Sequence, residues 1–234
     1  IRAKMVIELK AIFSETEVRS KLRWKYEEGI KRPYFHVKPL ERGQLKNWQD
    51  YLDFMKVEMA KEGGDLTEVE IIYERCLIAC ALYEEFWMDY VSWWESRKDL
   101  EESERQSRIR GIFERAGHKH LPTKVDLHTR WAAWEEKVGE SGEASRILQQ
   151  LELAHPGLVN VLLKRVNLER RRGRIEEACK LYEAAIAAAK TATASDLAVK
   201  YSRFLRLSLN DGAKAGEVLQ AAVDAESSNA KLYL

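Results

Sequence analysis

Residues 86–95 read Phe-Trp-Met-Asp-Tyr-Val-Ser-Trp-Trp-Glu and contain three of the chain's seven tryptophans. Trp87 is followed by Tyr90, Trp93 and Trp94 at three, six and seven residues, so an α-helix places these rings on one face. Such a face could stack on nucleic-acid bases or belong to a hydrophobic core. We favour the core, because an isolated helix of this length needs a packing partner to be stable in water.

The composition around this stretch predicts an all-α protein with a substantial core. Of 234 residues, 45% are hydrophobic and 33% charged, with only 4 prolines and 12 glycines. Net charge is +1, from 39 basic and 38 acidic residues, so nothing global indicates nucleic acid or an anionic membrane. No apolar run has the length of a membrane span, and we expect no membrane partner. Because the chain begins at Ile1 without a methionine, we expect it to be part of a longer protein.

The three cysteines predict a reducing compartment rather than a disulfide framework. Cys76 and Cys80 are one helical turn apart in an apolar run, and Cys179 is distant in sequence. Three cysteines at such spacings do not form a disulfide framework. We therefore expect all three to be small buried hydrophobic side chains.

Residues 1–39 are expected to form a separate N-terminal segment of helices followed by an extended linker. A helical piece covers residues 1–13, and Ser14 with Glu17 has the spacing of a capping box that opens a second helix to about Ile30. Residues 33–39, between two prolines, should be extended and pack along the helices as a brace. Residues 1–30 could also be a degenerate repeat.

Residues 40–234 are repetitive. Residues 72–76, Ile-Tyr-Glu-Arg-Cys, match residues 112–116, Ile-Phe-Glu-Arg-Ala. Equivalent positions in the first helix of each pair fall at residues 48, 87, 128, 162 and 198, at intervals of 39, 41, 34 and 36. This period predicts a solenoid of helical hairpins, with about five repeats and the start of a sixth near Asn229.

The pattern within the repeats resembles the half-a-TPR (HAT) repeat, a relative of the TPR repeat found in RNA-processing proteins. First helices read Trp-x-x-Tyr-x-x-aromatic, and second helices read aromatic-Glu-Arg-small. Leu162 and Ala198 replace the tryptophan in the fourth and fifth repeats. The resemblance implies a right-handed α-solenoid whose signature residues are structural: Trp48, Tyr51, Phe54, Tyr73, Glu74, Arg75, Trp87, Tyr90, Trp93, Phe113, Glu114, Arg115, Trp131, Trp134 and Glu135.

Within that class, residues 30–40, 44–48 and 74–87 look like the C-terminal HAT array of the pre-mRNA-processing factor 39 family. The resemblance implies a nuclear, non-catalytic scaffold of pre-mRNA splicing. It would associate with proteins of the U1 small nuclear ribonucleoprotein (U1 snRNP), which recognises 5′ splice sites. It would also dimerise through its C-terminal repeats, with itself or with a related HAT subunit.

The C-terminal repeat supplies the candidates for a dimer interface. A solenoid end without a polar cap exposes its last apolar face. Either a further repeat or a second chain would cover that face, and the family resemblance favours a second chain. The candidate residues are Val218, Leu219, Leu232, Tyr233 and Leu234.

A run of four arginines, Arg170, Arg171, Arg172 and Arg174, is the strongest local basic signal. Cations at a helix C-terminus complement the helix dipole, which is the simpler interpretation. Contact with RNA phosphates or with an acidic partner is the alternative. The rival function is therefore a direct RNA-binding HAT protein of another RNA-processing complex, such as one for 3′-end cleavage.

Signals for catalysis or for a cofactor are weak. The sequence has no Gly-rich phosphate loop, no His-Glu-x-x-His and no Cys-x-x-Cys. His118, His120 and His128 are close in sequence but straddle a helix exit, a loop and a new helix, which is poor geometry for a metal site. We expect no catalytic residues, no cofactor and no metal.

Overall fold

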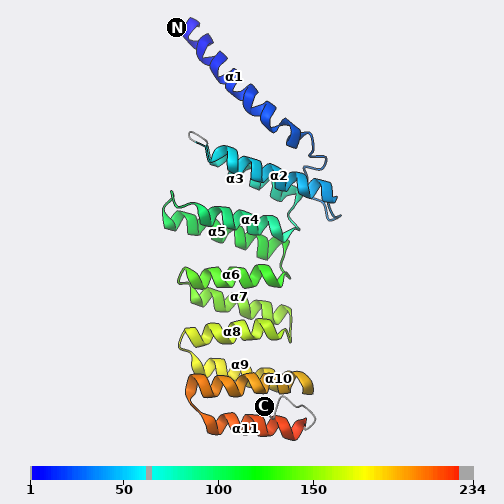
Figure 1. The fold of residues 1–234 in the computed structure, drawn as a ribbon, viewed down its shortest axis with the longest axis vertical. Coiled ribbons are helices and arrows are strands. Elements are labelled where there is room, and N and C mark those ends of the chain that lie inside the picture. The colour runs from blue at the N-terminus through cyan, green and yellow to red at the C-terminus, as the bar shows by residue number, and fades with distance from the viewer. Residues whose placement is uncertain (1, 62–64, 227–234) are drawn as a thin grey trace. The chain divides into compact units, whose positions relative to one another are not determined.

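The computed structural model describes residues 2–61 and 65–226, and over those residues the chain is all-α (Figure 1). Eleven α-helices and two short π-helical turns follow one another in these segments. Their bounds are α1 (Arg2–Glu27), α2 (Arg42–Met59), α3 (Thr67–Ala79), α4 (Glu84–Ser96), α5 (Glu102–Arg115), η1 (Ala116–His120), α6 (Val125–Lys137), α7 (Ser141–Ala154), α8 (Val159–Arg171), α9 (Ile175–Ala188), α10 (Thr191–Phe204), η2 (Leu205–Leu209) and α11 (Gly212–Ala225).

The chain divides into two compact units, Ile1–Pro122 and Thr123–Leu234. Unit 1 contains α1, the hairpins α2/α3 and α4/α5, and η1. Unit 2 contains the hairpins α6/α7, α8/α9 and α10/α11, with η2 between the helices of the last. The boundary expected after residue 39 lies inside unit 1.

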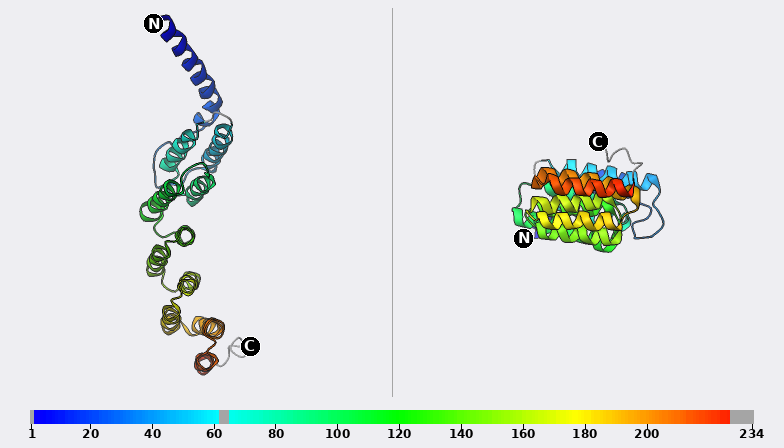
Figure 2. Two further views of the ribbon diagram at one scale, coloured as in Figure 1. Left: turned by 90° about the vertical axis from the view of Figure 1, so that its left-hand side faces the viewer. Right: turned by 90° about the horizontal axis from the view of Figure 1, so that it is seen from below.

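The helices pair in the order that the period predicts. In unit 2 they are seen nearly end on in the left-hand view of Figure 2, where α6 to α9 alternate between two rows. The all-α solenoid of HAT-type hairpins is confirmed. Its hairpins form because each amphipathic helix buries its apolar face only against its neighbours.

Residues that adopt a positive φ form turns between the two helices of a pair. Gly139, between α6 and α7, has a φ of 96°, a left-handed conformation that glycine adopts without steric cost. Asn210 ends η2 with a φ of 54°, which asparagine tolerates better than most residues.

The N-terminal segment differs from the sequence prediction. Helix α1 runs without interruption from Arg2 to Glu27, so the division at a Ser14 capping box is wrong. Ser14 and Glu17 are exposed positions within one long helix. A capping residue contributes only about 1 kcal/mol, which does not by itself stop a helix that can continue.

Large aromatic side chains form much of the core. Trp48, Trp87 and Trp131 are each 1% exposed, and Phe113 is equally buried. The three cysteines are buried and free, as expected. The aromatic face around Trp87 therefore packs between helices and is not available for stacking on bases.

No helix in the described part of the chain is both long enough and apolar enough to cross a membrane.

Candidate functional site

Glu74, on α3, binds side chains from the two helices that follow it. Its carboxylate accepts hydrogen bonds from Arg115 Nη1 and Nη2 on α5, both at 2.7 Å. It also accepts a hydrogen bond from the Tyr90 hydroxyl on α4 at 3.1 Å. Tyr73, the residue before Glu74, stacks on the Tyr90 ring with centroids 4.5 Å apart. Four side chains thus join three consecutive helices.

The same arrangement occurs one repeat earlier, where α1 takes the part of α3. Glu27 accepts hydrogen bonds from Arg75 Nη1 and Nη2 at 2.6 and 2.8 Å, and from the Tyr51 hydroxyl at 2.7 Å. Tyr26 stacks on Tyr51 with centroids 5.1 Å apart and rings within 4° of parallel. The end of α1 therefore occupies the position of a second helix in a preceding hairpin.

A third copy lies in unit 2. Glu183, on α9, accepts a hydrogen bond from the Tyr201 hydroxyl on α10 at 2.7 Å, and one from Lys214 Nζ on α11 at 2.9 Å. Tyr182 stacks on Tyr201 with centroids 5.1 Å apart. Lysine here takes the place of the arginine found in the other two copies.

We call this arrangement the hairpin joint. It consists of an aromatic-Glu dipeptide, a tyrosine from the next helix and a cation from the helix after that. The sequence pattern did not predict the copies at Tyr26-Glu27 and Tyr182-Glu183. The expected signature has tryptophan in the first helix of a hairpin and arginine directly after the glutamate in the second. The aromatic-Glu dipeptide itself is the signal that could have found them.

The electrostatics of the joints favour a structural role. Hydrogen bonding to Arg75 lowers the pKa of Glu27, and hydrogen bonds from Tyr201 and Lys214 lower the pKa of Glu183. Burial acts to raise the pKa of Glu74, but the Arg115 guanidinium outweighs it and the net shift is downward. Burial raises the pKa of Tyr90 well above its usual range. These carboxylates stay charged at neutral pH and are not poised as general acids or bases.

The other signature residues lie mostly in the core. Trp93, Trp134 and the three tryptophans named above are buried, and Phe54 is partly buried. Trp87 Nε1 donates to the Ala81 carbonyl at 2.9 Å, and Trp131 Nε1 donates to Glu135 at 3.1 Å. Glu135 is fully buried, whereas Glu114 is exposed.

The arginine run at the end of α8 is partly used inside the protein. Arg171 forms two hydrogen bonds with Glu136 on α6, at 2.6 and 2.7 Å. Arg172 donates to Glu169 at 2.8 Å. Arg170 and Arg174 are exposed. Two of the four guanidinium groups therefore already have a carboxylate partner, which weakens the run as a phosphate-binding patch.

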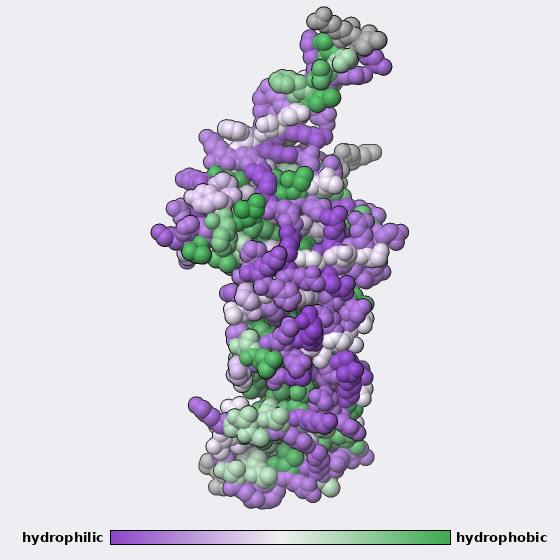
Figure 3. Space-filling view, turned by 180° about the vertical axis from the view of Figure 1, so that it is seen from behind, coloured by the Kyte–Doolittle hydropathy of each residue, from purple (hydrophilic) through white to green (hydrophobic). Residues whose placement is uncertain are grey.

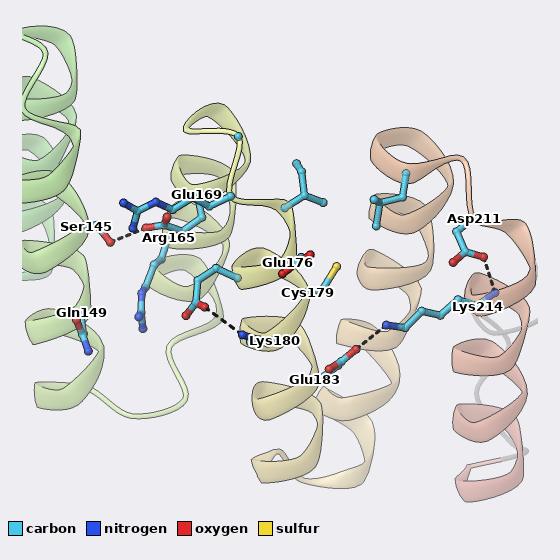
Figure 4. A pocket seen from close by; sticks show the side chains of 15 residues that line it. Ser145, Gln149, Arg165, Glu169, Glu176, Cys179, Lys180, Glu183, Asp211 and Lys214 are labelled. Carbon is cyan, nitrogen blue, oxygen red and sulfur yellow. Dashed lines mark hydrogen bonds and ion pairs between the residues drawn. The ribbon is translucent and has the colours of Figure 1, made fainter.

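Unit 2 contains a groove of about 1060 Å³ bounded by α7, α8, α9 and the start of α11 (Figure 4). Charged side chains of both signs line it. The carboxylates are Glu169, Glu176, Glu177, Glu183 and Asp211, and the cations are Arg165, Arg174, Lys180 and Lys214. Such a mixture suits a protein segment better than a polyanion.

Two buried polar atoms in this groove have no hydrogen-bond partner among the described residues: Glu169 Oε2 and Arg165 Nε. The other oxygen of Glu169 accepts a hydrogen bond from Ser145 at 2.5 Å (Figure 4) and another from Arg172. Buried polar atoms are nearly always satisfied. Both atoms are buried beneath the wall of the groove, so the charged side chains exposed along it are what a partner would meet.

The dimer candidates divide into two groups. Val218 and Leu219 lie on α11 and are partly buried. Val218 lines an apolar groove of about 480 Å³ between α9, α10 and α11. Leu232, Tyr233 and Leu234 lie outside the described residues.

The histidines show no arrangement for binding metal. His120 stacks on Trp87 with centroids 5.4 Å apart, and His128 Nδ1 lies 2.8 Å from the Lys124 carbonyl oxygen. Within residues 2–61 and 65–226, no group of three or more histidine, cysteine or acidic side chains could hold a metal ion.

Comparison with known proteins places these features in a family. The profile described as PRP39 C-terminal HAT repeat matches residues 21–171. Pre-mRNA-processing factor 39 of Xenopus laevis is 43% identical over 224 residues, which are 95% of this chain and 33% of the relative. The Homo sapiens protein of that name is 44% identical over 224 residues, 95% of this chain and 32% of the relative. The Schizosaccharomyces pombe protein is 38% identical over 161 residues, 68% of this chain and 25% of the relative. The chain spans about a third of the length of the curated relatives that it matches, and it belongs to the PRP39 C-terminal HAT repeat family.

Proposed function

We propose that this chain is a non-catalytic scaffold of pre-mRNA splicing, which acts in the nucleus together with U1 snRNP proteins at 5′ splice sites. The observation that carries the proposal is the hairpin joint. In its three copies, the charged and aromatic side chains that could do chemistry are used to hold consecutive helices together. The name of the relatives, pre-mRNA-processing factor 39, supports pre-mRNA processing as the process in which the chain acts.

The groove of unit 2 is the surface proposed for a U1 snRNP protein. Carboxylates and cations both line this groove, so a protein segment that carries charges of both signs can pair with it. Glu176 faces the same groove and has no ion-pair partner among the described residues, so it is free to meet a cation of the partner.

Dimerisation through the C-terminal repeats is the second part of the proposal. The apolar groove that Val218 lines, between α9, α10 and α11, supports it. Burying this surface against a second chain would stabilise the dimer by about 25 cal/mol for each Å² of apolar area removed from water. The second chain would be another copy or a related HAT subunit.

Direct RNA binding through the arginine run is the alternative. Arg170 and Arg174 would have to carry it, because Arg171 and Arg172 are already paired. Its signature would be affinity that falls steeply with salt and disappears when these two exposed arginines are replaced.

The scaffold proposal can be tested with purified U1 snRNP and the immobilised chain. We expect retention at physiological salt, weakened at least about fivefold by Glu176→Lys. Glu217→Lys is the matched control, since Glu217 is an exposed acidic residue on α11 outside the groove. Retention no greater than that of an unrelated protein would contradict the proposal. Equal effects of the two variants would show that the groove is not the surface that binds U1 snRNP.

A further inference from the structure

Two segments of unit 1 that lack acidic residues lie against each other. Residues 30–40 read Ile-Lys-Arg-Pro-Tyr-Phe-His-Val-Lys-Pro-Leu, and residues 116–122 read Ala-Gly-His-Lys-His-Leu-Pro. The centroids of the Phe35 and His120 rings are 6.4 Å apart, which places residues 30–40, the Pro-flanked segment, beside η1. In a chain with 38 acidic residues, this juxtaposition makes a local surface of basic and aromatic groups.

The Pro-flanked segment is fixed in place rather than loose. Arg32 Nη2 donates to the Lys38 carbonyl at 2.8 Å and ties the two ends of the segment together. The Leu40 N–H donates to the Tyr83 hydroxyl at 2.6 Å, and Leu40 is buried. His120, on the other side, stacks on the buried Trp87. A binding surface built here would lose little conformational entropy when a ligand docks.

The side chains between these anchors point to solvent. Tyr34 and Phe35 are 58% and 48% exposed, which is unusual for aromatic rings in this chain. Lys31, Lys38 and Lys119 are exposed and form no ion pair within the described residues. Figure 3 shows hydrophobic residues exposed among hydrophilic ones on one face of unit 1.

We propose that this surface, made by Lys31, Tyr34, Phe35, Lys38 and Lys119, binds single-stranded RNA. Exposed rings stack on unpaired bases without regard to sequence, and lysines beside them neutralise the backbone phosphates. A duplex would leave the rings unused, because its bases already stack on each other. This role goes beyond the scaffold function and uses none of the residues of the unit 2 groove.

The probe is a fluorescently labelled 12-nucleotide oligouridine, titrated with the 234-residue chain while anisotropy is measured at several salt concentrations. We expect Tyr34→Ala combined with Phe35→Ala to weaken binding about tenfold or more, as expected for the loss of base stacking. Trp24→Ala is the aromatic control, since Trp24 is 61% exposed and lies outside the surface. Each variant must keep the wild-type melting temperature.

The lysines are tested by charge reversal. Lys38→Glu with Lys119→Glu should weaken binding and make the slope of log K against log salt shallower by about 1.4, for two phosphate contacts of a single strand. Lys164→Glu with Lys200→Glu changes the net charge equally at exposed lysines of unit 2 and should leave the slope unchanged.

Three results would overturn the proposal. The first is no binding of the oligouridine at low salt. The second is equal loss of affinity in the test and control variants, which would mean a response to net charge alone. The third is displacement of the RNA by an equal concentration of polyglutamate, which would identify the surface as a site for an acidic protein.

Discussion

The Glu74 carboxylate and the Arg115 guanidinium form a two-point ion pair that links the second helices of consecutive hairpins, α3 and α5. Their side chains are 41% and 40% exposed, so solvent screens the charges and the net energy is small. The parallel geometry of a paired guanidinium and carboxylate is directional. Its main effect is therefore to fix how one hairpin lies on the next.

A double-mutant cycle measures that coupling. Glu74→Gln and Arg115→Met, singly and together, should give a coupling energy of about 0.5–1 kcal/mol by urea denaturation. Lys46 and Asp50 are the control pair, since they are more exposed and one turn apart on α2. Their coupling should be smaller, and equal values for the two pairs would mean that the joint adds nothing beyond a surface ion pair.

Trp87→Ala tests the aromatic core. Trp87 is 1% exposed and its indole N–H is satisfied by the Ala81 carbonyl. Removal should cost about 3–5 kcal/mol of the free energy of unfolding, as for other large-to-small core substitutions. Trp24→Ala should stay within about 0.5 kcal/mol, since Trp24 is exposed. If the two variants had the same stability, the core assignment would fail.

Tyr201→Phe tests the joint of unit 2. The change keeps the ring stacked on Tyr182 but removes the hydroxyl that donates to Glu183. We expect a loss of about 1 kcal/mol and faster amide exchange in α10 and α11. Tyr34→Phe is the control, because Tyr34 is 58% exposed. Unchanged exchange in α10 and α11 would show that this hydrogen bond does not support the last hairpin.

The joints also predict a dependence on pH. The pKa values of Glu27, Glu74 and Glu183 are lowered in the folded chain. Their contribution to stability is therefore complete above the unfolded pKa of about 4.3 and is lost as the pH falls through the lower folded values.

The melting temperature of the wild type should accordingly fall more between pH 7 and pH 3 than that of a Glu27→Gln, Glu74→Gln variant. The difference between the two proteins should be largest near neutral pH and should narrow below about pH 4. A difference that stayed constant across this range would show that the two carboxylates contribute as neutral hydrogen-bond partners.

Composition and periodicity were enough to predict the all-α class and its helical hairpins, because each amphipathic helix must bury its apolar stripe against a neighbour. It did not predict the partners of charged residues in other helices. Nothing local in the sequence pairs Arg171 with Glu136, or Arg75 with Glu27. The continuity of α1 was missed for a related reason: Ser14 can cap a helix, but an exposed serine can also remain inside one.

The molar mass of the chain in solution, measured by sedimentation equilibrium, tests the dimeric scaffold most directly. We expect twice the 27.1 kDa of one chain, reduced to the monomer mass by truncation after Asp224 and shifted toward it by Val218→Glu. A mass of 27.1 kDa at every concentration would contradict the proposed dimer, and a truncated chain that remained dimeric would place the interface away from the C-terminal repeats.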